Sequence, residues 1–188
     1  EDFLENLTSE VILIGKYHEA NPSADINAFL ETTQKRRFSA IFIVGSDDIL
    51  KVVSLSSGNK AREDELPGVD LSSYPLLSAA RTASRPTWSG KHISAITGDV
   101  TVGLAVPLTT GEAVIVEIPL DTIVEVGNVF REKSHLDYWV IDSKGEVVAD
   151  TSGVRTQLMN LSNLEIVQAG FARTEQPTLM NFRGQDYS

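Results

Sequence analysis

Six side chains between positions 74 and 117 are of types that bind small polar molecules. Glu117 is the most unusual of them, because it interrupts the apolar run AVIVEIPL at 113–120. In a strand, alternate residues share a face, which places Glu117 with Ile115 and Pro119. A carboxylate is costly to bury unless a partner compensates it. Glu117 therefore either faces solvent or points into a cavity that receives a polar or cationic group.

The other five candidates are Tyr74, Arg85, Trp88, His92 and Ser94. The planar guanidinium of Arg85 can hold both oxygens of a carboxylate, although an arginine before a proline also suits the surface. Trp88 could stack on a ligand or belong to the core, and Tyr74 could offer its hydroxyl or anchor a helix. His92 and Ser94 are two residues apart on one predicted strand and so share a face. A structural role for the histidine is the alternative.

Residues that would support catalysis or metal binding are scattered or missing. The chain has no cysteine, and the three histidines, His18, His92 and His135, lack the spacing of metal ligands. There is no nucleophile-elbow motif and no phosphate-binding loop. The sequence therefore predicts a non-catalytic domain without a cofactor or a metal, and a small hydrolase is the enzyme alternative.

Composition narrows the class of protein further. The 188 residues are 41% hydrophobic and 22% charged, which suits a globular core. A net charge of -10 argues against nucleic acid as a partner, because binding a polyanion requires clustered Lys and Arg. No run approaches 18 consecutive apolar residues, so no membrane span is expected. The first residues lack the features of a signal peptide and have helical character, as expected of an excised soluble fragment.

The candidate residues lie within a regular succession of predicted elements. Residues 2–34 are expected to be mostly helical, with a break at 21–23 and a new helical segment capped by Ser23. Two strands (38–44 and 50–55), a loop (56–70), a helix (74–83), a three-strand meander (88–120) and a helix (122–133) capped by Asp121 follow. The order then starts again with a hairpin (136–150), a helix (161–171) and a strand (178–182). This repetition predicts two consecutive modules of similar fold, the second about two strands short.

The order of these segments resembles the double CACHE sensor domains, which are extracytoplasmic ligand-binding modules of bacterial and archaeal transmembrane receptors. The segments that carry the resemblance are FSAIFIVGSDD, GVDLSSYP, ITGDVTVGLAVPL, VIVEIPLDTI and DYWVIDSKGEVVAD. The resemblance implies an α+β fold with a long N-terminal helix (1–37) and two PAS-like antiparallel-sheet modules. Residues 38–133 would form the membrane-distal module, and residues 134–188 an incomplete membrane-proximal one.

The resemblance also implies where a ligand binds. Amino-acid-binding members carry an Arg-x-Trp-Tyr element, then a Tyr-x-Asp on the next strand and an acid on the strand after. Residues 85–89 match the first element loosely, Ile93 and Ala95 stand at the second, and Glu117 matches the acid. The expected ligand is a small molecule of the amino acid, amine or organic acid class, bound in the distal module.

The expected context is a periplasmic domain attached to the membrane by flanking helices, dimeric through its N-terminal helix. Its ligand would bias an equilibrium between two conformations. The expected output is a histidine kinase, with a diguanylate cyclase or a chemoreceptor as alternatives. A different class of function is also open, namely a protein-interaction or dimerisation module that binds no small molecule.

Overall fold

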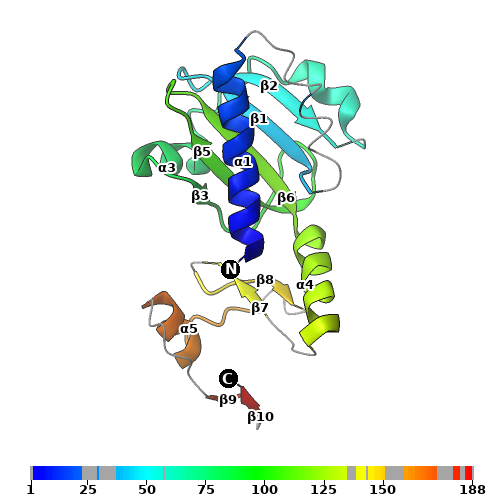
Figure 1. Ribbon diagram of the computed structural model, residues 1–188, viewed down its shortest axis with the longest axis vertical. Helices are drawn as coiled ribbons and strands as arrows, with labels where there is room; N and C mark the ends of the chain where they lie inside the picture. Colours follow the sequence, from blue (N-terminus) through cyan, green and yellow to red (C-terminus); the bar gives the residue numbers. More distant parts are fainter. Residues whose placement is uncertain are drawn as a thin grey trace. The chain divides into compact units, whose positions relative to one another are not determined.

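The chain folds into two compact units, which comprise Glu1–Thr122 and Ile123–Ser188 (Figure 1). The computed structural model describes residues 2–22, 29, 37–56, 58–134, 139–142, 144–150, 159–172, 180–182 and 185–187. Apart from residue 29, which is helical, the helical segment predicted after Ser23 lies outside the described residues, and so does His135. The membrane-distal and membrane-proximal assignments of the two modules stay predictions.

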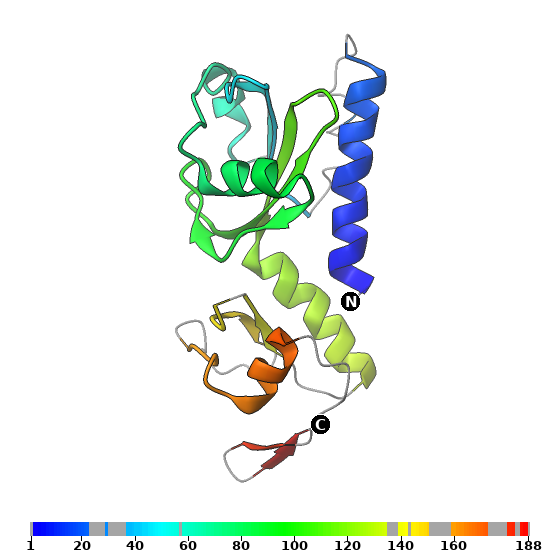
Figure 2. The ribbon, with the colours of Figure 1, turned by 90° about the vertical axis from the view of Figure 1, so that its left-hand side faces the viewer.

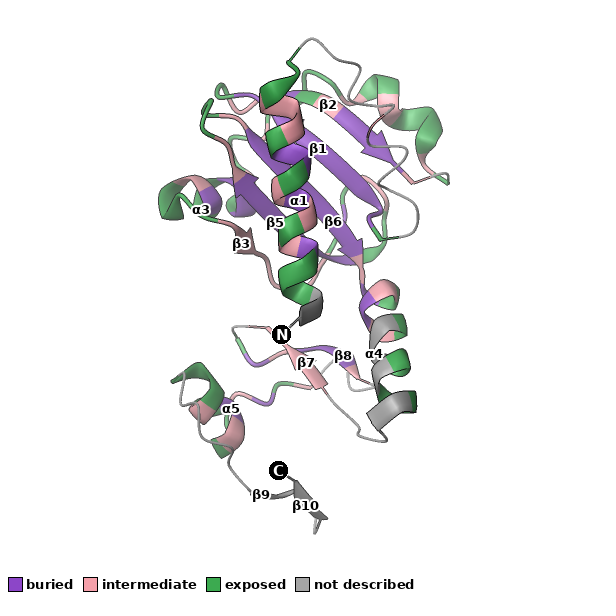
Figure 3. Ribbon diagram, in the orientation of Figure 1, coloured by how far each residue is buried: buried purple, intermediate pink, exposed green. Residues whose placement is uncertain are grey.

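Unit 1 contains an antiparallel sheet in which the strands lie in the order β2-β1-β6-β5-β3, and β4 also pairs with β5. The strands are β1 (Ala40–Val44), β2 (Leu50–Leu55), β3 (Thr87–Trp88), β4 (His92–Ile93), β5 (Val100–Pro107) and β6 (Ala113–Pro119). Figure 3 shows that β1, β5 and β6 are buried along most of their lengths. These central strands are rich in Val and Ile, which suits strands covered on both faces.

Helix α1 (Asp2–Ala20) covers one face of this sheet. Leu7, Val11 and Ile14 recur at spacings of three and four and are fully buried, as their periodicity predicts. Gly15 allows close packing, because a Cβ atom there would lie 2.5 Å from Cδ2 of Leu108. Figure 2 shows α1 on one side of the sheet and α3 on the other.

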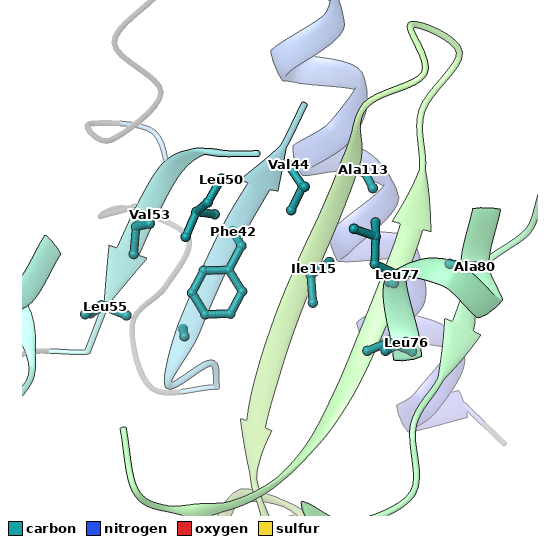
Figure 4. Packing of buried hydrophobic residues seen from close by; sticks show 12 residues of the cluster. Phe42, Val44, Leu50, Val53, Leu55, Leu76, Leu77, Ala80, Ala113 and Ile115 are labelled. Atoms are coloured by element: carbon teal, nitrogen blue, oxygen red, sulfur yellow. The ribbon is translucent and has the colours of Figure 1, made fainter. Parts of the chain in front are cut away.

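Helix α3 (Pro75–Ala83) packs on the opposite face, where the sequence predicts a helix with proline in its first turn. Tyr74 is the extended N-cap residue, and Ser84 ends the helix in the left-handed region with a φ of 51°. The helix contributes Leu76, Leu77 and Ala80 to a core that includes Phe42, Val44, Leu50, Val53, Leu55 and Ile115 (Figure 4). A 3-10 helix, η1 (Lys60–Glu65), lies within the predicted loop.

The predicted meander differs from the observed one in its first strand. Residues 88–96 do not form one strand, because β3 and β4 are separated by Ser89, Gly90 and Lys91. Trp88 pairs with Leu104 and His92 with Thr101, so three residues on this edge face two on β5. The extra residue is a bulge, which bends the edge strand and reverses which face the following side chains occupy.

Unit 2 holds the repeated order of elements. Helix α4 (Leu120–Ser134) enters it from unit 1, so Asp121 lies inside the helix and does not cap it. The predicted hairpin is present as β7 (Trp139–Ile141) and β8 (Val147–Asp150), followed by α5 (Glu165–Phe171), β9 (Met180–Phe182) and β10 (Gln185–Tyr187). Strand β9 pairs with β10, and β7 with β8. The predicted α+β class, with a helix followed by antiparallel sheet, is confirmed.

Candidate functional site

Glu117 lies on β6 in the middle of the sheet of unit 1 and is only 4% exposed. Its neighbours across the ladders are Ala40 on β1 and Gly103 on β5. Both are small, so the carboxylate is flanked by backbone and a single methyl group. Ile115, two residues earlier on the same face, belongs to the α3-side core, which places Glu117 on that face as well. The carboxylate is thus buried at the end of an apolar core.

Ser94 fixes one oxygen of this carboxylate. Its hydroxyl donates to Oε2 of Glu117 at 2.6 Å, and it accepts the backbone N–H groups of Ile96 and Thr97 at 3.1 and 3.0 Å. The hydroxyl therefore ties the turn between β4 and β5 to the carboxylate. Ser94 is itself 2% exposed, which keeps water from this side of the site.

His92 approaches the other oxygen. Its Nε2 lies 3.7 Å from Oε1 of Glu117, 3.4 Å from Oγ1 of Thr101 and 3.5 Å from Oη of Tyr74. Its Nδ1 lies 3.2 Å from the carbonyl oxygen of Gly90. The Ser89 hydroxyl lies 3.4 Å from the same nitrogen and donates to the Gly90 carbonyl. Because a carbonyl can only accept, these surroundings favour the tautomer with a proton on Nδ1, in which Nε2 is the nitrogen that titrates.

The Glu117 carboxylate raises the pKa of His92, partial burial opposes this rise, and the Gly90 carbonyl adds to it. Burial, with a further contribution from the charge of Glu117, raises the pKa of Tyr74 to about 12. Tyr74 therefore stays a neutral hydroxyl whose ring packs against the apolar core. The site thus combines a carboxylate, a titratable imidazole and the hydroxyls of Ser94, Thr101 and Tyr74 within a few ångströms.

The structure separates Arg85 and Trp88 from the residues around Glu117. Trp88 pairs with Leu104, which faces α1, and it lines a shallow groove with residues of α1 that include Leu4 and Thr8. Its indole thus lies on the opposite face of the sheet from Glu117. Arg85 is exposed, beyond the end of α3. Tyr74, His92 and Ser94 are the predicted residues that the structure brings to Glu117.

Three residues at the site were not predicted, namely Ser89, Thr101 and Gly103. The Ser89 hydroxyl accepts the N–H of Gly103 at 2.7 Å and donates to the Gly90 carbonyl at 2.7 Å. Gly103 makes room for Leu76, because a Cβ atom there would lie 2.6 Å from Cδ2 of that leucine. It would be in ordinary contact with Cε1 of His92, at 3.6 Å. A glycine inside the apolar run VTVGLAV was the available signal, since such a glycine often marks a close approach.

A second polar cluster occurs at the other end of α3. Nη2 of Arg81 lies 2.9 Å from Oδ1 of Asp48 and donates to the carbonyl of Gly45 at 2.7 Å. The cluster borders a cavity of about 150 Å³ that Ser78 also lines. These contacts clamp the β1–β2 turn to α3. Within the described part of the chain, no group of three His, Asp or Glu side chains could hold a metal ion.

Solved structures share this arrangement of elements. An extracellular ligand-binding receptor from Desulfohalobium retbaense superposes with a TM-score of 0.70 at 14% identity, over 97% of this chain and 34% of its own. The ligand-binding domain of the Campylobacter jejuni chemoreceptor Tlp3, in complex with 4-methylisoleucine, has a TM-score of 0.67 at 10% identity, over 98% and 77%. The extracellular domain of rpHK1S-Z16, described as a histidine kinase, has a TM-score of 0.66 at 16% identity, over 95% and 77%.

This chain has the fold of an extracellular sensor domain. The resemblance to double CACHE sensor domains is therefore confirmed at the level of the fold. The chain spans about a third of the length of the Desulfohalobium receptor. No sequence model of a known protein family matches it, and no curated protein matches it by sequence. Among the helices that the structure describes, none is long and apolar enough to cross a membrane.

Proposed function

We propose that this sensor domain binds a small molecule with a cationic group on the α3 face of unit 1, where Glu117 accepts that group. The observation that carries the proposal is a buried carboxylate without a lysine or arginine partner among the described residues. A fixed charge at the end of an apolar core is costly to bury, and ionisable groups in such surroundings cluster at functional sites. An ammonium group is the ligand chemistry that compensates it.

The remaining residues of the site have roles that follow from their chemistry. Tyr74 and His92 offer polar atoms beside the carboxylate, while Ser94 holds it in a fixed orientation. Leu76, packed beside Gly103, supplies apolar contact for the body of the ligand. This combination suits an amine or an amino acid better than an organic acid. The amino acid derivative bound to the Campylobacter neighbour supports the same class.

The domain would act as the extracytoplasmic, non-catalytic part of a transmembrane signalling protein, most simply a histidine kinase. A diguanylate cyclase or a chemoreceptor would use the same sensor differently. Dimerisation through α1 is part of this proposal. Leu7, Val11 and Ile14 pack on the sheet of the same chain, so the dimer contact would use the opposite side of α1, where Leu13 is 58% exposed.

A thermal-shift screen against amines, amino acids and organic acids tests the proposal. A compound that binds only the folded domain raises its melting temperature in proportion to the logarithm of its concentration. We expect hits among cationic and zwitterionic compounds, and their loss in Glu117→Gln, which keeps the shape and the acceptor for Ser94. The matched control is Glu112→Gln on the β5–β6 turn, which should keep every hit.

The alternative is an interaction module whose α3 face is occupied by its own side chains. Leu76 over Gly103 and His92 beside Glu117 are the observations that favour it. Absence of any stabilising compound across the screen, with the domain folded, would contradict ligand binding and leave this alternative. Sedimentation of the domain at increasing concentration would then test self-association directly.

A further inference from the structure

The imidazole of His92 lies where a cationic ligand would meet Glu117. It enters from the edge strand β4, and its Nε2 is 3.7 Å from Oε1 of the carboxylate. The ring lies beside Gly103, the register partner of Glu117, because a Cβ atom at 103 would lie 3.6 Å from Cε1 of His92, at ordinary van der Waals distance. The position opposite the acid is therefore bordered by a side chain of the protein itself.

The hydrogen-bond chemistry makes this contact depend on protonation. When Nε2 is neutral it can only accept, so the hydroxyls of Thr101 and Tyr74 are its suitable partners. The carboxylate of Glu117 also only accepts, so a neutral Nε2 has no bond to offer it. When Nε2 is protonated, the imidazolium becomes the counter-ion of the buried acid.

We propose that His92 is an internal competitor for the cation site of Glu117, so that an external cation must displace the protonated imidazole in order to bind. This inference rests on the proposed function, because it assumes that Glu117 accepts a cation. The titratable groups that face His92 among the described residues are Glu117 on β6 and Tyr74 ahead of α3. Lys91 is its neighbour along the chain.

Competition has a defined consequence for pH dependence. Glu117 is available to an external cation only in protein molecules whose His92 is neutral. The apparent affinity for the cation therefore decreases as the neutral fraction of His92 decreases. Binding then releases a proton at pH values between the pKa of His92 in the free domain and the lower pKa of the displaced ring in the complex. Within this range the apparent affinity falls about tenfold for each pH unit of acidification, and above the pKa of the free domain it is constant. Because Glu117 raises the pKa of His92, the pH range in which the cation binds weakly extends above the usual pKa of histidine.

Free imidazole is a suitable probe of the site, since it has the shape and charge of the group that it replaces. In His92→Ala at pH 6, imidazolium should enter the vacated space beside Glu117 and raise the melting temperature saturably, by a few degrees. The wild-type domain should show no such rise. The double variant His92→Ala/Glu117→Gln should also show none, because the acid that holds the probe is gone.

Equal stabilisation of the wild type and His92→Ala by imidazole, or none of either, would overturn the inference. A measurement without any probe covers the case in which His92→Ala does not fold. The pKa of His92, followed by NMR, should fall in Glu117→Gln relative to wild type, and an unchanged value would also overturn it. A compound from the screen that binds with the same affinity at pH 5.5 and 8, and equally to wild type and His92→Asn, would overturn the competition while leaving the proposed function intact.

Discussion

Gly103 on β5 is the register partner of Glu117 on β6. The charged side chain therefore lies directly opposite a residue that has no side chain. The space beside Gly103 is filled by Leu76 from α3, and the ring of His92 from β4 lies next to it. Three elements distant in sequence therefore meet at a single backbone position.

Gly103→Ala should disturb both the packing and the site. Its Cβ atom would lie 2.6 Å from Cδ2 of Leu76 and 3.3 Å from Oγ of Ser89, so the leucine must move within a packed core. Overpacking of this kind costs about 1–3 kcal/mol, measured as the loss in free energy of unfolding in urea. Gly58→Ala is the matched control, because no heavy atom lies within 4 Å of a Cβ atom there. Equal stability of the two variants would contradict the close approach.

The stability of the domain should depend on pH through His92. Its pKa is raised in the folded protein by Glu117, so its contribution to stability is fully present below about pH 6.5, the value for an unfolded histidine. The contribution is lost as the pH rises through the higher, folded value. The difference in free energy of unfolding between wild type and His92→Asn should therefore narrow from pH 6 to pH 8.5.

Each pH unit by which the NMR-measured pKa of His92 exceeds 6.5 corresponds to about 1.4 kcal/mol of the difference in free energy of unfolding between wild type and His92→Asn. Urea titrations at four pH values would measure it, with His18→Asn as the control, because the imidazole of His18 lies beside Glu112 and away from the core site. A difference that widens with pH would mean that the folded state favours the neutral form of His92.

Much of the fold follows from local sequence signals. Pro75 marks the first turn of α3, Gly145 takes a φ of 79° in the β7–β8 turn, and the stripe through Leu7 and Val11 faces the sheet as its spacing predicts. The backbone geometry of the proline and the glycine, and the tendency of the leucine and the valine to be buried, determine the local structure at these positions. Their structure therefore depends little on segments far away in the chain.

The site was less predictable, because it depends on one extra residue in an edge strand. In a regular strand Trp88 and His92, four residues apart, would share a face. The bulge at Ser89–Lys91 places Trp88 against α1 and His92 beside Glu117. Composition does not encode such a bulge. It is fixed by the Ser89 hydroxyl, which accepts the N–H of Gly103 in place of a backbone carbonyl.

The clamp between Arg81 and the β1–β2 turn should contribute measurably to stability. Arg81 donates to the carbonyl of Gly45 at 2.7 Å and pairs with Asp48 at 2.9 Å. Asp48 has a φ of 63°, a conformation that the turn must hold in place. Arg81→Gln should lower the free energy of unfolding by about 1–3 kcal/mol, because it leaves a carbonyl and a partly buried carboxylate without their cation.

Arg85→Gln is the matched control for this clamp. It removes the same charge four residues later, from an exposed side chain, and should change the free energy of unfolding by no more than about 0.5 kcal/mol. Chemical denaturation of both variants at one ionic strength gives the comparison. A similar loss in free energy of unfolding for Arg81→Gln and Arg85→Gln would indicate that the net charge of the domain, and not the contacts of Arg81, determines the effect.

The packing of α1 on the sheet can be tested by comparing a buried and an exposed leucine of this helix. Leu7 is fully buried against the sheet, so Leu7→Ala should cost about 2–5 kcal/mol in free energy of unfolding. Leu13 is 58% exposed, so Leu13→Ala should cost less than about 0.5 kcal/mol at protein concentrations at which the domain is monomeric. Trp88 lines a groove with residues of α1 and reports on that contact by its fluorescence. In a Trp139→Phe background, urea should change the Trp88 emission at lower concentration in Leu7→Ala than in Leu13→Ala. The same midpoint in both variants would mean that the buried stripe of α1 does not hold the helix on the sheet.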